Sequence, residues 1–287
     1  MRPPPLPVRD GLGPSRVRLR GGSVLVEMAD RFGEAAAQKV LAGEVFTADG
    51  VVVTAATVLA PGTHVYLYRE IHDEVPVPFD IPVLYRDDNI VVVDKPHFLA
   101  TMPRGRHVTQ TATVRLRREL DLPELSPAHR LDRLTAGVLV FTTHRQVRGA
   151  YQTLFAQGSV RKTYLARAGV RADLTFPLTL RSRIIKQRGQ LQAMQVPGEP
   201  NASTLLEHHG DGLYRLTPHT GRTHQLRVHM NALGLPIFGD PLYPHVIDVA
   251  ADDFSAPLHL LAQSLEFVDP LTGLPRSFLS RRELPSG

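Results

Sequence analysis

The chain has 287 residues, of which 43% are hydrophobic, so it is long enough to bury a sizeable core. It contains no cysteine, which excludes disulfide frameworks, thiolate nucleophiles and cysteine-ligated metal sites. No segment has enough consecutive apolar residues to span a bilayer, and none has the pattern of a signal peptide. We therefore expect a cytoplasmic protein with no membrane partner.

The net charge of +5 favours a polyanionic partner. Nearly all of the positive charge is arginine, because the only lysines are Lys39, Lys95, Lys162 and Lys186. A guanidinium group can grip a phosphate through two hydrogen bonds, whereas an ammonium group acts as a point charge. Codon bias in a GC-rich genome would produce the same composition, so the placement of the arginines has to decide between the two causes.

The N-terminal region has the features of a small α/β domain. An amphipathic helical stretch precedes a turn at Ala48-Asp49-Gly50, which separates two β-prone runs as a hairpin requires. A proline-rich connector at residues 75–82 is extended and poor in backbone donors, which indicates a domain boundary. We therefore expect a small domain at residues 1–78 and a larger one at residues 79–287.

The larger domain mixes strands and helices. Buried apolar runs predict strands, whereas apolar residues three and four apart predict helices. The predicted strands are residues 89–95, 137–143, 160–168, 190–196, 202–208 and 213–217, and the predicted helices are residues 109–120, 147–157 and 222–233. Strands and helices do not alternate cleanly, so we expect an α+β fold with a mixed, largely antiparallel central β-sheet and flanking helices.

The segment with the most chemical character is HRLDRLTAGVLVF, at residues 129–141. A charged loop runs directly into a buried strand, which puts Asp132 at the edge of a sheet, where catalytic groups on loops commonly lie. Its neighbours Arg130 and Arg133 favour the ionised carboxylate. Taken alone, such a charged string is more typical of a surface salt-bridge cluster.

This segment resembles the active-site motif of the RluA-type pseudouridine synthases, commonly His-Arg-Leu-Asp, two variable residues and Thr-Ser-Gly. Two further segments match that family in the right order, KTYLA at residues 162–166 and GRTHQLRVHMNALGLPIFGDPLY at residues 221–243. Upstream, Lys95-Pro96 matches the end of the family's first catalytic strand. The resemblance covers roughly residues 83–268. It implies the pseudouridine synthase fold and an isomerase that converts a uridine in RNA into pseudouridine.

The resemblance also implies roles for individual residues. Asp132 would be the central catalytic carboxylate, Tyr164 would stack on the uracil and move a proton, and Arg227 would be the catalytic basic residue. The further substrate contacts would be His129, Arg222, His224 and the pocket-lining aliphatic Leu226. Ala136 departs from the pattern, because it stands where the family usually has serine; the contact of that hydroxyl is in doubt, but no charged group is lost.

Elementary chemistry agrees with these roles. A carboxylate can attack the sugar as a nucleophile, or it can remove a proton beside the glycosidic carbon. The sequence leaves both routes open, and either needs Asp132 in its charged form. Burial disfavours that form unless a cation compensates, and Arg227 is the expected cation.

Access to the RNA base sets a further requirement. A base inside a helix must leave its stack to reach a catalytic pocket. We expect Arg130 to fill the vacated space or to grip the backbone. One basic group lies in a segment that the sequence predicts to be a loop between strands; it contains Arg181, Arg183 and Lys186. We expect this stretch to bind RNA, with an affinity that falls steeply with salt.

His219, His224 and His229 recur every five residues, a spacing that does not put them on one helical face. No HExxH pattern is present. We therefore expect no metal site, and the reaction implied by the resemblance needs no cofactor.

The N-terminal region loosely resembles the alpha-L RNA-binding domain that often precedes such enzymes. The basic helix of that domain is poorly represented here. The family divides between 23S ribosomal RNA and transfer RNA, and we expect ribosomal RNA to be the substrate of a monomeric enzyme.

Two other classes of function compete with this interpretation. A non-catalytic RNA chaperone would bind RNA without isomerising it, but Asp132, Tyr164 and Arg227 are all intact. A hydrolase of small glycosides generally needs two acidic residues that flank the scissile bond. The matching segments show no second acid for that role.

Overall fold

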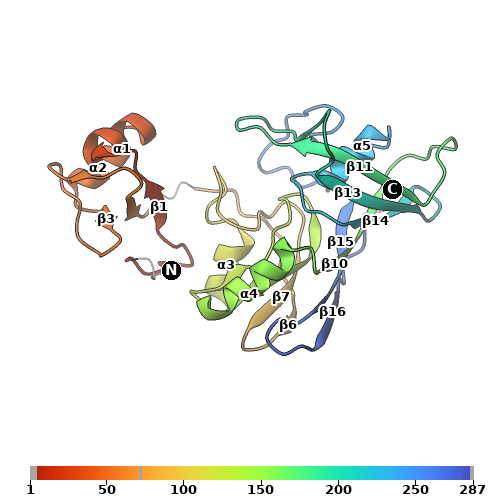
Figure 1. The fold of residues 1–287 in the computed structure, drawn as a ribbon, viewed down its shortest axis with the longest axis horizontal. Helices are drawn as coiled ribbons and strands as arrows, with labels where there is room; N and C mark the ends of the chain where they lie inside the picture. Colours follow the sequence, from red (N-terminus) through yellow and green to blue (C-terminus); the bar gives the residue numbers. More distant parts are fainter. Residues whose placement is uncertain (1–4, 71–72, 285–287) are drawn as a thin grey trace. The chain divides into compact units, whose positions relative to one another are not determined.

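The computed structural model describes residues 5–70 and 73–284, and the chain divides into two compact units, Met1–Asp73 and Glu74–Gly287 (Figure 1). The division falls just ahead of the proline-rich connector. The second unit holds the start of this connector, because the Glu74 carboxylate accepts hydrogen bonds from the backbone N–H groups of Val108, Thr109 and Gln110 at 2.9, 2.7 and 3.1 Å.

The first unit combines two helices with short antiparallel strands. Helix α1 is Val24–Phe32 and α2 is Glu34–Leu41. One sheet has the order β1-β5-β3 (Ser15–Arg18, His64–Leu67 and Phe46–Thr47), and β2 (Gly22–Ser23) pairs with β4 (Val58–Leu59). Its core contains Val24, Met28, Val40, Val45, Val53 and Val65, which are almost completely buried. The helices and strands thus bury their apolar faces against one another.

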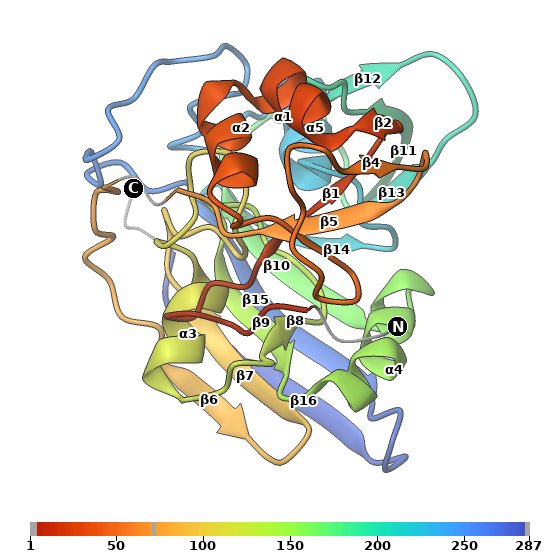
Figure 2. The ribbon, with the colours of Figure 1, turned by 90° about the vertical axis from the view of Figure 1, so that its left-hand side faces the viewer.

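The second unit is built on an 11-stranded sheet, whose main path has the order β12-β11-β13-β14-β10-β15-β9-β7-β6. These strands are Met194–Val196, Leu178–Ile185, Ala202–His208, Leu213–Pro218, Arg161–Arg167, Leu260–Val268, Ala136–Thr142, Ile90–Lys95 and Val83–Arg86. Two more strands lie off this path, β16 (Pro275–Leu279) beside β15 and β8 (Ser126–Pro127) beside β9. Figure 2 shows the sheet running from β12 at the top to β6 at the bottom.

All strand pairs in this sheet are antiparallel except β9 with β15. The mixed, largely antiparallel sheet expected from the sequence is therefore confirmed. Three helices accompany it, α3 (Ala112–Glu119), α4 (Arg145–Ala156) and α5 (Gln225–Ala232). No helix in the described part of the chain has the length and apolar composition needed to cross a membrane.

The helices cover the sheet according to the alternation of its side chains. On β9, Leu139 and Phe141 pack with Leu116 of α3, whereas Val138 and Val140 pack with Tyr151 of α4. Successive side chains of a strand point to opposite faces, so α3 and α4 lie on opposite sides of β9. Helix α5 packs its Leu226 and Met230 against β10, β13 and β14.

Gly137 explains how the parallel pair can form. Its φ is +114°, and a Cβ at this position would lie 2.2 Å from the carbonyl oxygen of Ala262 on β15. Only glycine allows both this dihedral angle and so close an approach of two backbones. The glycine therefore joins β9, which follows the Asp132 loop, to β15 in the middle of the sheet.

Two sequence predictions about local structure were wrong. Residues 181–188 were read as a loop, but β11 contains Arg181 and Arg183, whose exposed side chains alternate with the buried Ser182 and Ile184. Helix α5 was expected from residue 222 but begins at Gln225, because His224 has the left-handed backbone conformation (φ 56°). Each difference moves charged side chains relative to the expected site.

Candidate active site

The loop that carries Asp132 spans residues 128–135, between β8 and β9. Thr101 holds it from the side: its hydroxyl donates to the carbonyl of Leu131 at 2.7 Å and accepts from the N–H of Leu131 at 3.1 Å. The N–H of Thr135 donates to the carbonyl of Asp132 at 3.1 Å, which closes a turn. The backbone of the loop is thereby fixed while its polar side chains remain available.

Lys95 also holds the Asp132 loop in place. Its ammonium group is completely buried and donates to the carbonyls of Pro96, Leu99 and Arg133 at 2.8, 2.7 and 3.3 Å. Burial lowers the pKa of Lys95 well below its usual value, and the charge of Asp132 acts in the opposite direction. Three carbonyl oxygens match the three protons of an ammonium group, so Lys95 ties the end of β7 to the Asp132 loop.

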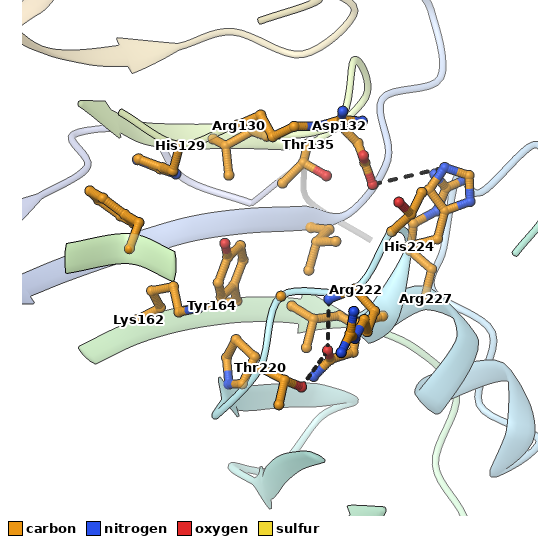
Figure 3. A pocket seen from close by; sticks show the side chains of 18 of the residues that line it. His129, Arg130, Asp132, Thr135, Lys162, Tyr164, Thr220, Arg222, His224 and Arg227 are labelled. Atoms are coloured by element: carbon orange, nitrogen blue, oxygen red, sulfur yellow. Dashed lines mark hydrogen bonds and ion pairs between the residues drawn. The ribbon is translucent and has the colours of Figure 1, made fainter. Parts of the chain in front are cut away.

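A cavity of about 480 Å³ lies between this loop, strand β10 and the start of α5 (Figure 3). The residues expected at the site that line it are His129, Arg130, Asp132, Tyr164, Arg222, His224, Leu226 and Arg227. Segments that are distant in the sequence thus contribute to one cavity. Arg181, Arg183 and Lys186 do not line it, because they lie on β11 and in the β11–β12 connection.

Arg227 does not form the expected ion pair with Asp132. Its Nε and Nη2 donate to the two carboxylate oxygens of Asp240 at 2.7 and 2.6 Å, and both side chains are buried. Burial alone would lower the pKa of Arg227, but the hydrogen bonds and charge of Asp240, followed by the charge of Asp132, raise it. The guanidinium therefore acts on Asp132 through its field, while Asp240 holds it in place.

Asp240 is the second acid that the sequence interpretation overlooked. It lies in the third matching segment, 13 residues after Arg227. Its Oδ1 also accepts from the N–H groups of Leu242 and Tyr243 at 2.8 and 3.2 Å. These bonds commit Asp240 to Arg227 and to its own loop, so it is not placed as the second carboxylate of a glycoside hydrolase.

His224 lies close to Asp132. Its Nε2 lies 4.0 Å from Oδ2 of Asp132, and its Nδ1 lies 3.0 Å from the hydroxyl of Tyr243. That hydroxyl already accepts from the N–H of Ala193 at 2.7 Å and donates to the carbonyl of Ala193 at 2.9 Å. Because a hydroxyl has a single proton, Nδ1–H of His224 is the donor in the third contact.

The charge state of His224 follows from its surroundings. Burial lowers its pKa to about 4, although the charge of Asp132 acts in the opposite direction. The imidazole is therefore neutral near pH 7. With the proton on Nδ1, the Nε2 lone pair faces the Asp132 carboxylate, and a substrate hydroxyl between these two acceptors could donate to either.

Tyr164 lies on β10 and lines the cavity beside Asp132 (Figure 3). Burial, followed by the charge of Asp132, raises the pKa of its hydroxyl far above the usual range. The phenol therefore keeps its proton throughout the physiological range. A protonated hydroxyl can donate a hydrogen bond, while the ring offers a flat apolar surface.

Two side chains join the end of the β11–β12 connection, just before β12, to the loop that follows Asp240. The hydroxyl of Tyr243 bonds to both backbone groups of Ala193, and the side-chain amide of Gln192 donates to the carbonyls of Leu242 and Pro244. The hairpin that carries the basic residues is thus joined to the loop that holds Arg227.

The three histidines of the third segment do not share a function. His229 is buried between the hydroxyls of Ser182 and Thr204, each 2.9 Å from one of its ring nitrogens. His219 directly follows the last residue of β14. Over residues 5–70 and 73–284, no group of three His, Asp or Glu side chains could hold a metal ion.

Lys162 also lines the cavity, and the sequence interpretation gave it no role. It lies two residues before Tyr164 on β10, and side chains two apart on a strand point to the same face. That spacing within KTYLA was the signal that could have identified it.

Comparison with known proteins identifies the family. The model of the RNA pseudouridylate synthase family matches residues 89–232. The chain is 32% identical over 215 residues to the dual-specificity RNA pseudouridine synthase RluA of Yersinia pestis, which covers 70% of this chain and 98% of that protein. It is 35% identical over 191 residues to human pseudouridylate synthase RPUSD2, which covers 63% of this chain but only 34% of that longer protein.

A solved structure of a pseudouridylate synthase is also similar to this chain. The human RNA pseudouridylate synthase domain containing 1 superposes with a TM-score of 0.55 at 25% identity, over 71% of this chain and 84% of that chain. The match to the family covers the segments that carry Asp132, Tyr164 and Arg227. The chain therefore belongs to the RluA-type RNA pseudouridine synthases, isomerases that convert uridine in RNA into pseudouridine.

Proposed function

We propose that Asp132 is the catalytic carboxylate of this isomerase and that Arg227 and Tyr164 are its catalytic partners. The observation that supports this is the position of Asp132 at a cavity where the buried, charged Arg227 and the protonated Tyr164 also lie. Asp132 attacks C1′ of the ribose or removes the C2′ proton, and the two routes remain open. The positive charge of Arg227 attracts the Asp132 carboxylate in either case.

The surrounding residues receive roles from the same proposal. Tyr164 stacks on the uracil, and Leu226, which is buried at the wall of the cavity, packs against the base. His224 accepts a hydrogen bond from a ribose hydroxyl that lies between its Nε2 and Asp132. Arg222 donates to the carbonyl of Asn201 at 3.0 Å and lies at the mouth of the cavity, where it contacts the RNA backbone.

Arg130 is proposed to stabilise the flipped state of the target nucleotide. Its side chain is exposed at the rim of the cavity, and within the described residues it has no hydrogen bond or ion pair. A free guanidinium at this rim can fill the space left by the flipped base or bind the adjacent phosphate. Arg130→Ala is expected to weaken both RNA binding and turnover.

Replacement of Asp132 by asparagine tests the central proposal. The variant keeps the shape of the side chain but loses its charge, so pseudouridine formation is expected to fall by about 10³-fold or more. Binding of the same RNA should remain within a few fold. The matched control is Asp252→Asn, in an exposed loop, which should be as active as the wild type. A variant Asp132→Asn with near-normal turnover would remove Asp132 from the mechanism.

The substrate is proposed to be a uridine in structured RNA, with 23S ribosomal RNA favoured and transfer RNA as the alternative. Basic groups on β11 and in the first unit supply contacts beyond the cavity, which suits a large folded RNA. Chemical mapping of pseudouridine in total RNA, with and without the gene, decides between them. A single modified position lost from transfer RNA alone would reject the ribosomal assignment.

The first unit is proposed to bind RNA as well. A cavity of about 480 Å³ in this unit is lined by the basic residues Arg16, Arg18, Arg31, Lys39 and Arg69, together with Phe32 and Tyr68. Positive charge interleaved with aromatic rings is typical of surfaces that bind single-stranded nucleic acid. The sequence interpretation found too little charge on the helix, because most of these cations lie on or after strands.

Paired substitutions test this surface. Arg16→Ala with Arg18→Ala is expected to raise the Kd for RNA and to make binding less dependent on salt, with an unchanged rate at saturating RNA. The matched control is Arg20→Ala, an exposed arginine of the same unit outside this cavity. Equal affinity of the double variant and the control would contradict RNA binding by the first unit.

The enzyme is proposed to act as a monomer, as expected from its sequence. Light scattering at the concentrations used for the activity assay checks this. A dimer that dissociates together with loss of activity would reject it.

A further inference from the structure

Two hydrogen-bond donors without partners face one end of the catalytic cavity. Lys162 lines the cavity from β10, and within the described residues its ammonium group has no hydrogen bond and no ion pair. His129 lines the cavity from the Asp132 loop. Figure 3 shows both on one side of Tyr164, while Asp132, His224 and Arg227 lie on the other side. The cavity therefore has an acid at one end and unsatisfied donors at the other.

The proton of His129 can be assigned from its contacts. Its Nε2 accepts a hydrogen bond from the N–H of Val140 at 3.2 Å, and its ring stacks on Phe155 with 4.2 Å between the ring centroids. Burial, followed by the charge of Lys162, lowers its pKa to about 3, so the ring is neutral. A neutral ring that accepts at Nε2 carries its proton on Nδ1, which leaves Nδ1–H as a donor.

Unpaired donors in a half-buried site are costly unless a ligand satisfies them. Burial lowers the pKa of Lys162. The ammonium group is therefore partly desolvated, and it has no counter-charge among the described residues. Such an arrangement is typical of a site that is completed by an anionic or strongly accepting ligand.

The uracil of the reacting nucleotide is the ligand whose chemistry fits this position. Its O2 and O4 are hydrogen-bond acceptors, and they become negatively charged when the base separates from the sugar. With C1′ at Asp132 and the ring stacked on Tyr164, O4 lies across the ring from the glycosidic bond and points away from Asp132, toward Lys162 and His129. We propose that Lys162, assisted by Nδ1–H of His129, binds a carbonyl oxygen of the uracil and stabilises the uracil anion during the reaction.

This inference deepens the proposed function and rests on it for the position of the ribose. The C1′–N1 bond breaks, and its electron pair stays on the uracil, spread over O2 and O4. The sugar is left bonded to Asp132 at C1′, or unsaturated after its C2′ proton has moved to Asp132. After the ring turns, C5 bonds to C1′ while the C1′–Asp132 bond breaks; in the second route it bonds while the proton on Asp132 returns to C2′. C5 then loses its proton to a base, and N1 takes up a proton. The donors act during the interval in which the ring carries the charge, as an oxyanion hole does.

The test compares Lys162→Met and Lys162→Arg with the wild type in single-turnover reactions. Methionine keeps the length of the side chain and removes its charge, and its folded state should be at least as stable as the wild type. Arginine keeps the charge. The matched control is Arg161→Met, the exposed neighbour on the same strand, whose side chain is 71% exposed. His129 is not replaced, because its Nε2 also holds the N–H of Val140 in β9.

Two RNA substrates separate a chemical role from a structural one. One carries uridine at the target position and the other carries 5-fluorouridine, whose fluorine makes the departing ring a weaker base. We expect Lys162→Met to slow consumption of the uridine substrate by about 100-fold, the effect typical of one lost oxyanion donor. The factor by which Lys162→Met slows consumption of the 5-fluorouridine substrate should be at least about tenfold smaller, because the anion of the fluorinated ring needs less stabilisation. Lys162→Arg should recover a large part of the rate.

Several outcomes would overturn the inference. Equal losses on both substrates would assign Lys162 a structural role. A raised Kd with a shallower salt dependence and an unchanged rate at saturation would assign it to a phosphate. Full activity of Lys162→Met beside an inactive Asp132→Asn would reject this inference and leave the proposed function intact. Turnover by Asp132→Asn would instead reject the proposed function itself.

Discussion

Arg227 and Asp240 form a buried pair in which both carboxylate oxygens accept a hydrogen bond from the guanidinium, at 2.6 and 2.7 Å. The pair joins helix α5 to the loop that follows it, and its Arg227 lines the cavity that contains Asp132. Removal of one partner leaves the other as an uncompensated buried charge, which is far more costly than the loss of an exposed ion pair. The two residues therefore stabilise the fold and, in the proposed mechanism, also support the chemistry.

Asp240→Asn is expected to lower the free energy of unfolding by about 3–5 kcal/mol, because Arg227 loses its counter-charge in the interior. Pseudouridine formation should fall as well, because the guanidinium is no longer held at the cavity. Urea denaturation and a single-turnover assay measure the two effects. Glu44→Gln, which breaks the exposed pair with Lys39, should cost less than about 1 kcal/mol. Equal costs at the two positions would contradict this account of the pair.

His229 is expected to make the stability depend on pH. Burial lowers its pKa to about 4 from an ordinary value of 6.5. The unfolded chain takes up this proton near its ordinary pKa and the folded chain only near the lowered one, so a falling pH favours unfolding. The contribution of neutral His229 is complete above pH 6.5 and is lost by about pH 4, on the order of 3 kcal/mol.

Urea denaturation as a function of pH checks this dependence. The free energy of unfolding of His229→Gln should vary less between about pH 7 and about pH 4 than that of the wild type. His245→Gln, at an exposed position, serves as the control and should follow the wild-type curve. Parallel curves for all three proteins would show that His229 is not the titrating group.

Gly137→Ala is expected to destabilise the fold by more than about 3 kcal/mol, or to prevent folding. The added methyl group would lie 2.2 Å from the carbonyl oxygen of Ala262, and the φ of +114° is unfavourable for alanine. Gly149→Ala is the matched control, because a Cβ there meets no atom within 4 Å in helix α4. That change should be neutral or stabilise by up to about 1 kcal/mol. Thermal unfolding of both variants distinguishes the two glycines.

The triple variant Arg181→Ala, Arg183→Ala, Lys186→Ala is expected to bind RNA more weakly without a change in the rate at saturation. Each lost phosphate contact should reduce the slope of log Kd against log salt by about 0.7–0.9. Arg86→Ala, on β6 at the opposite edge of the sheet, is the control. A triple variant with an unchanged salt slope would exclude these residues from the RNA interface.

The sequence predicted most of the sheet and the residues around the cavity, because each of these features has its own pattern within a short segment of the chain. Buried apolar runs such as residues 90–95 and 136–142 read as strands, and the structure confirms both. The three matching segments each hold a side chain that lines the cavity, Asp132, Tyr164 and Arg227. Short motifs retain this information because each of these residues is fixed by the loop, strand or helix of its own segment.

The pairings between segments could not be predicted in the same way. The partner of Arg227 is Asp240, which a turn brings back after helix α5 ends. Strand β11 was misread because its outward side chains are charged, so the period-2 pattern of LTLRSRII looked like a basic loop. The ammonium group of Lys95 donates hydrogen bonds to three carbonyl oxygens from two segments, and no sequence pattern predicts such a site.

The bonds of Tyr243 and Gln192 divide the β11–β12 hairpin into a fixed base and a replaceable tip. Residues 186–191, which form the tip, are exposed and lie beyond those bonds. Insertions, deletions or changes of charge in this tip would therefore leave the loop that holds Arg227 undisturbed. Under the proposed RNA contact of this hairpin, the choice of RNA can thus change while the proposed catalytic residues keep their positions.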